Sequence, residues 1–231
     1  MVSMPSYKKT LLTLLGLFFI SLAGCATETH QTVKVTPVET HNTPYHGTKS
    51  TLVVGQFENR SSYMHGIFSS GVDELGNQAR TILKTDLQQT NHFNVVDRAN
   101  MKVLQEEASY SGVSQQISGA RYVVTGAITE FGRKVTGDKQ LFGILGRGKT
   151  QTAYAKATLN IVDVTNSEII YSTQAAGEYE LSNREVIGFG GTAGYDSTLN
   201  GKVLNLAITE AVNNIVRDID NGALTLENTT K

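Results

Sequence analysis

The sequence predicts an α+β domain in which a small mixed β-sheet is covered by helices and carries two long β-hairpins. One observation is the order of the patterns, because β-branched runs and amphipathic stripes follow one another as β-α-β-α-β-β-β-α. A second is that two strand-like stretches lead into glycine-rich segments and return with the same alternation. The third is that all three prolines precede residue 45, which leaves the later strands and helices uninterrupted.

The composition is that of one globular domain of ordinary size, with 231 residues, 18% charged and 39% hydrophobic. A formal net charge of −1 predicts no binding to nucleic acid. The single cysteine, Cys25, excludes an intramolecular disulfide and a cysteine-based zinc site. The histidines before residue 50 are spaced along a polar linker, so we expect neither a metal site nor a cofactor.

Residues 1–24 have the pattern of an export signal, with Lys8 and Lys9 before an apolar run too short to span a bilayer comfortably. The run ends in Leu-Ala-Gly before Cys25, which resembles the bacterial lipobox, whose cysteine is acylated. No aspartate follows, which resembles the signal for outer-membrane sorting. We therefore expect lipidation of Cys25 and a periplasm-facing lipoprotein in the outer membrane of a Gram-negative bacterium. The alternative is an ordinary signal peptide with a chance cysteine.

Residues 25–49 are rich in Thr, His and Pro without apolar periodicity, which predicts a lipidated tether. The domain is expected over 50–221, with hairpins at about 131–158 and 172–198 and a polar tail over 222–231. Asp97 is placed as the N-cap of the second helix. The other elements are predicted as a strand over 51–57, a helix over 72–87, a strand over 93–96, a helix over 97–107, a central strand over 119–132 and a final helix over 202–219.

Residues 143–150 match the nucleotide-binding pattern G-x-x-x-x-G-K-[ST]. In a true P-loop a hydrophobic strand precedes the glycines, and a helix follows to present its N-terminus to the phosphates. Here a polar segment precedes them, and the residues that follow alternate like a strand. We therefore assign the glycines to a hairpin tip. No Cys–His pair or other catalytic arrangement occurs at motif spacing, so the protein is not expected to be an enzyme.

Four stretches, in this order, resemble the CsgG/HfaB family of outer-membrane lipoproteins that export curli subunits. They are 93–107, 119–132, 157–172 and 202–219. The resemblance implies a homo-oligomeric ring in which each subunit donates two hairpins to one large transmembrane β-barrel. It also implies an exported protein substrate and accessory periplasmic proteins as partners. The competing hypothesis is a periplasm-facing lipoprotein that regulates a cell-envelope partner without forming a pore, similar to the activators of peptidoglycan synthases.

Barrel strands alternate between apolar residues toward lipid and polar residues toward the lumen. In the return arm of the first hairpin, Ala153, Ala155, Ala157 and Leu159 alternate with polar residues, which gives an apolar face rich in small side chains. Soluble amphipathic hairpins are the alternative interpretation of this alternation.

In the family's curli exporter, the loop after the first strand narrows the channel. Its tyrosine and phenylalanine recur here at the same spacing as Tyr63 and Phe68, while Ile67 stands where that exporter has asparagine. The resemblance therefore implies a channel constriction formed by Tyr63, Ile67 and Phe68. The alternative is that the two aromatic residues pack the loop onto its own domain.

Overall fold

The computed structural model describes residues 35–63, 72–139, 147–185 and 199–227. One five-stranded sheet has the strand order β2-β1-β3-β4-β5; β2, β1 and β3 are parallel, and β3, β4 and β5 are antiparallel. This confirms the predicted mixed sheet with helices. The elements are β1 Ser50–Asn59, α2 Glu74–Gln89, β2 Phe93–Val96, α3 Met101–Tyr110, β3 Tyr122–Lys139, β4 Arg147–Asp163, β5 Ile169–Glu185 and α4 Leu199–Asp220.

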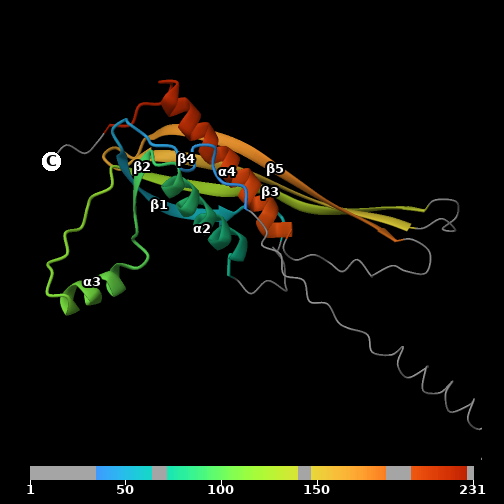
Figure 1. The fold of residues 1–231 in the computed structure, drawn as a ribbon, viewed down its shortest axis with the longest axis horizontal. Helices are drawn as coiled ribbons and strands as arrows, with labels where there is room; N and C mark the ends of the chain where they lie inside the picture. The colour runs from blue at the N-terminus through green and yellow to red at the C-terminus, as the bar shows by residue number, and fades with distance from the viewer. Residues whose placement is uncertain (1–34, 64–71, 140–146, 186–198, 228–231) are drawn as a thin grey trace, which may run out of the picture. The chain divides into compact units, whose positions relative to one another are not determined.

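Helices α2 and α4 cover one face of the sheet (Figure 1). The sheet contributes every second residue of its strands to the core, and the helices contribute the apolar stripes that their periodicity predicts. The start of α2 is fixed by Asp73, whose carboxylate accepts hydrogen bonds from the backbone N–H groups of Gly76 and Asn59, both at 2.7 Å. This cap ties α2 to the end of β1. Among the described residues, no helix is both long and apolar enough to cross a bilayer.

The predicted start of the second helix is wrong. Helix α3 begins at Met101, four residues after Asp97. The Asp97 carboxylate instead accepts hydrogen bonds from the Ala99 N–H at 3.0 Å and the Asn100 side chain at 2.6 Å, and it pairs with Lys84 of α2 at 2.9 Å. These bonds form a turn that competes with helix formation, as aspartate side chains commonly do.

The stretches that flank the predicted domain lie against it. Within the predicted tether, Val38 is 1% exposed, and the Glu39 N–H donates to Asn213 of α4 at 3.0 Å. Within the predicted tail, Leu224 is 6% exposed, and the Leu226 carbonyl accepts a hydrogen bond from the side chain at the start of β1. These apolar residues are isolated in the sequence, so no periodicity marked them as part of the core.

The predicted first hairpin consists of β3 and β4, which are paired without a break from Glu130–Lys156 to Lys139–Arg147. The described part of the P-loop look-alike, 147–150, belongs to β4 and is a strand, as its alternation predicts. The outgoing arm of the predicted second hairpin is β5, which pairs with β4. The signal segment with Cys25, the constriction residues Ile67 and Phe68, and residues 186–198 of the second hairpin lie outside the described residues.

Candidate functional site at the base of the projecting strands

Three strands continue past the N-terminal end of α4 (Figure 1), and the point where they leave its cover is the candidate site. Cross-strand pairing aligns Arg133 of β3 with Ala153 of β4 and with Tyr179 of β5. The first turn of α4 lies at this level. The Arg133 Nε donates to the Asn200 side chain at 2.8 Å, and the Lys202 ammonium lies 5.0 Å from the centre of the Tyr179 ring. We call residues 134–139, 147–152 and 180–185 the outer segments.

From its first turn toward its C-terminal end, α4 lies close to the sheet. A methyl group added at Gly177 would come within 2.7 Å of the Leu206 Cβ and 2.8 Å of the Ala207 N. The alternate residues of β4 from Ala153 to Ile161 are at most 1% exposed. Small side chains at these positions let the helix backbone approach the strands.

The interpretation of the alternating face of β4 as lipid-facing therefore needs correction. Ala153, Ala155, Ala157 and Leu159 lie under α4 and in the core, not on a surface that lipid could reach. The alternation itself is real, but the medium on its apolar side is protein. Of the described parts of β3, β4 and β5, only the outer segments extend beyond this cover.

Tyr63 also lies beside the first turn of α4, where it packs the loop after β1 against the projecting strands. Its ring packs on Phe131 of β3, with centroids 4.6 Å apart, and Asn200 donates a hydrogen bond of 3.5 Å to its hydroxyl. The Asn59 side chain donates to the Tyr63 carbonyl at 2.9 Å. The loop thus starts from a point fixed by three elements: β1, β3 and α4. Of the three predicted constriction residues, the structure places only Tyr63.

Sequence reasoning missed Phe131 and Arg133 as members of this site. Their inward orientation follows from a register shift between Ile128 and Glu130, which inserts one residue into β3. Strict alternation from Tyr122 would put both side chains on the opposite face. Phe131 is 5% exposed, and the spacing of three residues between it and the buried Ile128 was the available signal.

A family model described as the curli production assembly/transport component CsgG matches residues 34–228. This chain belongs to the CsgG family. A protein of Neisseria meningitidis serogroup B that is named as a lipoprotein is 62% identical over 204 residues, which are 88% of this chain and 92% of that protein. The family and this relative support an assignment as a Gram-negative outer-membrane lipoprotein.

The solved structures that this chain resembles are more distant. The PelC dodecamer from Paraburkholderia phytofirmans is 17% identical with a TM-score of 0.35, over 74% of this chain and 91% of that chain. A crystal structure of a lipoprotein from Neisseria meningitidis is 19% identical with a TM-score of 0.32, over 74% of this chain and 99% of that chain.

The outer face of the CsgG-family sheet is polar beside the candidate site. Lys156 of β4 and Glu130 of β3 form a salt bridge of 2.5 Å, and Glu178 is exposed on β5. The Tyr154 ring lies over Gly132, where any side chain would collide with it. This face carries charge where the opposite face carries alanine, so the two faces of the projecting strands are chemically distinct.

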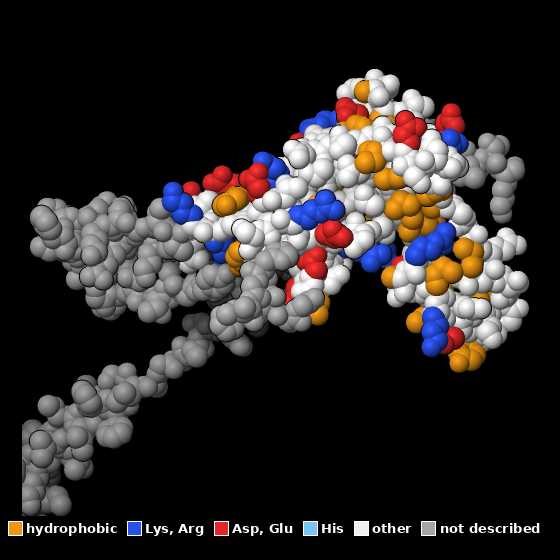
Figure 2. All heavy atoms as spheres, turned by 180° about the vertical axis from the view of Figure 1, so that it is seen from behind, with side chains coloured by type: hydrophobic (Ala, Val, Ile, Leu, Met, Phe, Trp, Pro, Cys, Tyr) orange, Lys and Arg blue, Asp and Glu red, His pale blue; other side chains and the backbone are white. Residues whose placement is uncertain are grey.

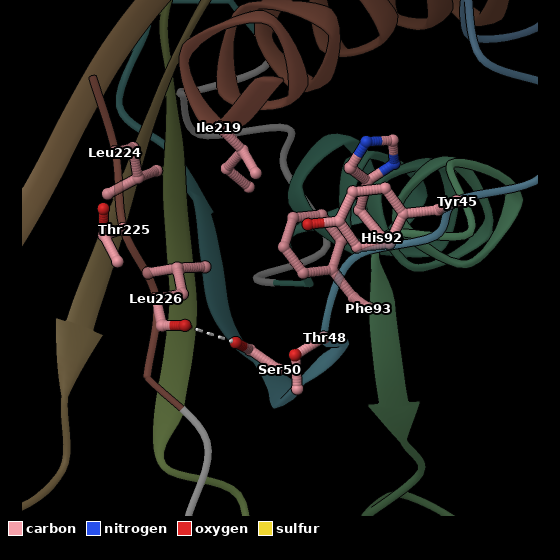
Figure 3. Close-up of a pocket in the computed structure, with 9 residues that line it drawn as sticks. All are labelled: Tyr45, Thr48, Ser50, His92, Phe93, Ile219, Leu224, Thr225 and Leu226. Carbon is pink, nitrogen blue, oxygen red and sulfur yellow. Dashed lines mark hydrogen bonds between the residues drawn. The ribbon is translucent and has the colours of Figure 1, made fainter. Parts of the chain in front are cut away.

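A second feature lies at the end of the CsgG-family domain opposite the projecting strands. A cavity of about 270 Å³ lies there between the start of β1 and the C-terminal segment (Figure 3). His92 closes one side: its ring packs on Tyr45 with centroids 4.0 Å apart, and its Nε2 lies 3.0 Å from an Asp220 carboxylate oxygen. Within the described ranges, no cluster of three or more His, Cys, Asp or Glu side chains could hold a metal ion. The lining is Tyr45, Thr48, Ser50, His92, Phe93, Ile219, Leu224, Thr225 and Leu226.

Proposed function

We propose that this protein is an outer-membrane lipoprotein, acylated at Cys25, whose subunits form an oligomeric secretion channel for extracellular protein subunits of the curli type. Membership of a family of curli transport and assembly components supports a function in export and not in catalysis. The observation that carries the proposal is the set of strands that continue, paired, beyond the helix that covers the rest of the sheet.

The lengths of two sequence segments that begin in the outer segments fit membrane hairpins. Residues 134–152 and 180–198 each contain nineteen residues, which is about nine for each arm of a hairpin. Transmembrane barrel strands need about 9–11 residues. In the proposed assembly, each subunit inserts these two hairpins, and the charged face beside Lys156 and Glu130 stays outside the lipid.

The loop after β1 supplies the constriction in this proposal. Tyr63 anchors the loop through its contacts with Phe131 and Asn200. The family resemblance assigns Phe68 and Ile67, which lie outside the described residues, to the same constriction. Identical subunits in a ring would repeat these side chains around the axis, and the result would be a narrow apolar gate.

The alternative is a periplasm-facing lipoprotein that regulates an envelope partner without a pore. One observation favours it: the alternating alanines of β4 are covered by α4, so the lipid-facing surface must come entirely from the outer segments and the residues beyond them. In that case the projecting strands would be soluble arms that bind a partner.

The deciding experiment uses the lipidated chain extracted from outer membranes in mild detergent. Electron microscopy should show rings, and planar bilayers should show steady conductance that increases in Phe68→Ala. Lys102→Ala, on the exposed surface of α3, is the matched control and should conduct like the wild type. Small particles that never conduct would refute the channel and favour the regulatory alternative.

A further inference from the structure

A row of β-branched side chains crosses all five strands on the face of the sheet opposite α2 and α4. Strand pairing places Val96 of β2 beside Val53 of β1, Val53 beside Val123 of β3, Val123 beside Val162 of β4, and Val162 beside Ile169 of β5. The flanking residues on these strands are the ones that point into the core, so the row faces away from both helices. Ile169 is 58% exposed, and the four valines are partly exposed. We call these five residues the valine row.

Helix α3 also presents apolar side chains that no other described residue covers. Val103 is 56% exposed, Leu104 is 44% exposed and Tyr110 is 81% exposed, and the rest of the described chain buries none of the ten residues of α3. The segment after the helix adds Val113 at 63% and Ile117 at 53%. Isolated helices shorter than about 12–15 residues are marginal in water, so a ten-residue helix needs packing against a partner.

The position of α3 is set by specific bonds. Asp97, just before the helix, pairs with Lys84 of α2, and the hydrogen bond from that lysine is the main cause that lowers the pKa of Asp97 to about 2. Arg98 donates to the carbonyl of Ser118 at 2.5 Å and so links the chain before α3 to the chain after it. Figure 2 shows hydrophobic side chains on the α3 lobe and at the end of the sheet, with a hollow between them. The described chain therefore leaves α3 without a packed face of its own.

The exposed apolar area is of the size that an interface needs. The exposed fractions of the five side chains on and after α3 correspond to about 500 Å². Exposed patches of roughly 300–600 Å² on a monomer are often functional, and a standard interface buries about 800 Å² per partner. Summed over these five side chains, the exposed apolar area is therefore more than half of what one partner buries in a standard interface.

Ring symmetry explains why the two surfaces differ. Subunits in a ring meet head to tail, so each carries two different, complementary patches instead of one patch that meets itself. A helix that exposes Val103, Leu104 and Tyr110, with Glu107 among them, can pack on a sheet face of β-branched residues, since helices pack on sheets throughout α/β domains. The chain carries both surfaces.

We propose that α3 of one subunit packs on the valine row of the next subunit and closes the ring. This inference rests on the proposed oligomeric channel. It names the contact that holds neighbouring subunits together outside the membrane. The occupant of the valine row is thus a second copy of this chain.

The test uses Leu104→Cys combined with Val123→Cys in the full lipidated chain. Cys25 is the sole native cysteine, and its acylation leaves no competing thiol. Mild oxidation in outer membranes should give a ladder of disulfide-linked multimers on non-reducing gels. Ser109→Cys with Val123→Cys is the matched control and should give no ladder, because Ser109 lies on the opposite side of α3 from Leu104. Mixed subunits carrying one cysteine each should give dimers only.

A second measurement does not depend on a disulfide. Leu104→Asp should raise the concentration for half-dissociation of rings roughly thirtyfold or more, as loss of an interface hot spot does. Ser109→Asp adds the same charge on the other side of α3 and should leave the rings intact. Both residues are exposed, so neither change should prevent folding.

The outcomes separate this inference from the proposed channel. Rings that conduct but give no Leu104–Val123 ladder would overturn the interface and leave the channel standing. Particles that form no rings in the wild type would refute both. A cross-link within one chain would show that α3 closes on its own sheet, and a cross-link to another protein would show a foreign occupant; each result overturns the inference.

Discussion

Asp86 provides a prediction whose size follows from the structure. Its side chain points from α2 toward α4, is 4% exposed, and accepts a hydrogen bond of 2.9 Å from the Thr209 hydroxyl. Burial raises the pKa of Asp86 from 3.8 to about 6, and the hydrogen bond from Thr209 opposes part of that rise. An ionised carboxylate at this position therefore lowers the free energy of unfolding at neutral pH.

The sign of the effect follows from proton binding. Between about pH 4 and pH 6, the folded chain keeps a proton on Asp86 that the unfolded chain has lost, so the free energy of unfolding decreases as the pH rises through this window. A shift of about two pKa units corresponds to about 3 kcal/mol. Above pH 6 the whole penalty is present, and below pH 4 it is absent.

Asp86→Asn should therefore raise the free energy of unfolding by about 2–3 kcal/mol at pH 7.5 and leave it nearly unchanged at pH 4. Asparagine keeps an acceptor for Thr209, so the hydrogen bond survives. The assay is denaturant unfolding of the detergent-solubilised chain, followed by circular dichroism from pH 4 to pH 8. Asp97→Asn is the contrasting control: its pKa is lowered, so its removal should destabilise the chain at pH 7.5. A loss of stability in Asp86→Asn at pH 7.5 would refute the reasoning.

Three further changes test the packing around α4. Gly177→Ala should destabilise the fold by about 1–3 kcal/mol, because the added methyl collides with the α4 backbone, whereas Gly119→Ala has open space and should cost little; equal melting temperatures would contradict this. Phe131→Ala should cost about 3–5 kcal/mol in denaturant unfolding through loss of a buried ring, and a much smaller loss would show that the base of the projecting strands is loosely packed. Tyr171→Phe removes a hydrogen bond of 2.6 Å to Asp218 and should cost only about 1 kcal/mol in the same assay; a loss as large as that of Phe131→Ala would refute this assignment.

Strong periodicity made much of this fold predictable. The observed bounds of α2, Glu74–Gln89, and α4, Leu199–Asp220, lie within three residues of the ranges predicted from their apolar stripes. The strand Phe93–Val96 was predicted with the same bounds. In each case the local pattern and the tertiary packing favour the same conformation, so sequence reasoning succeeds where they agree.

Other features depend on contacts between distant residues, which no local pattern reveals. Val38 is buried where its neighbour Glu39 bonds to Asn213 of α4, more than 150 residues away in the chain. The start of α3 depends on Lys84, which draws Asp97 into a turn instead of a cap. The site residues Phe131 and Arg133 depend on one inserted residue in β3, which reverses the side chains that follow. Tyr63 entered the prediction through the family resemblance, and the structure supplies its partners.

The alanine alternation in β4 shows why period alone does not identify the surrounding medium. Lipid and a covering helix both exclude water, so both select an apolar residue at every second position. Side-chain size separates the two cases. A lipid face gains from large apolar residues, whereas a helix that approaches a strand as closely as α4 approaches Gly177 requires alanine or glycine. The small residues at Ala153, Ala155 and Ala157 therefore indicate a helix-covered strand. A lipid-facing surface would have to come from residues 134–152 and 180–198.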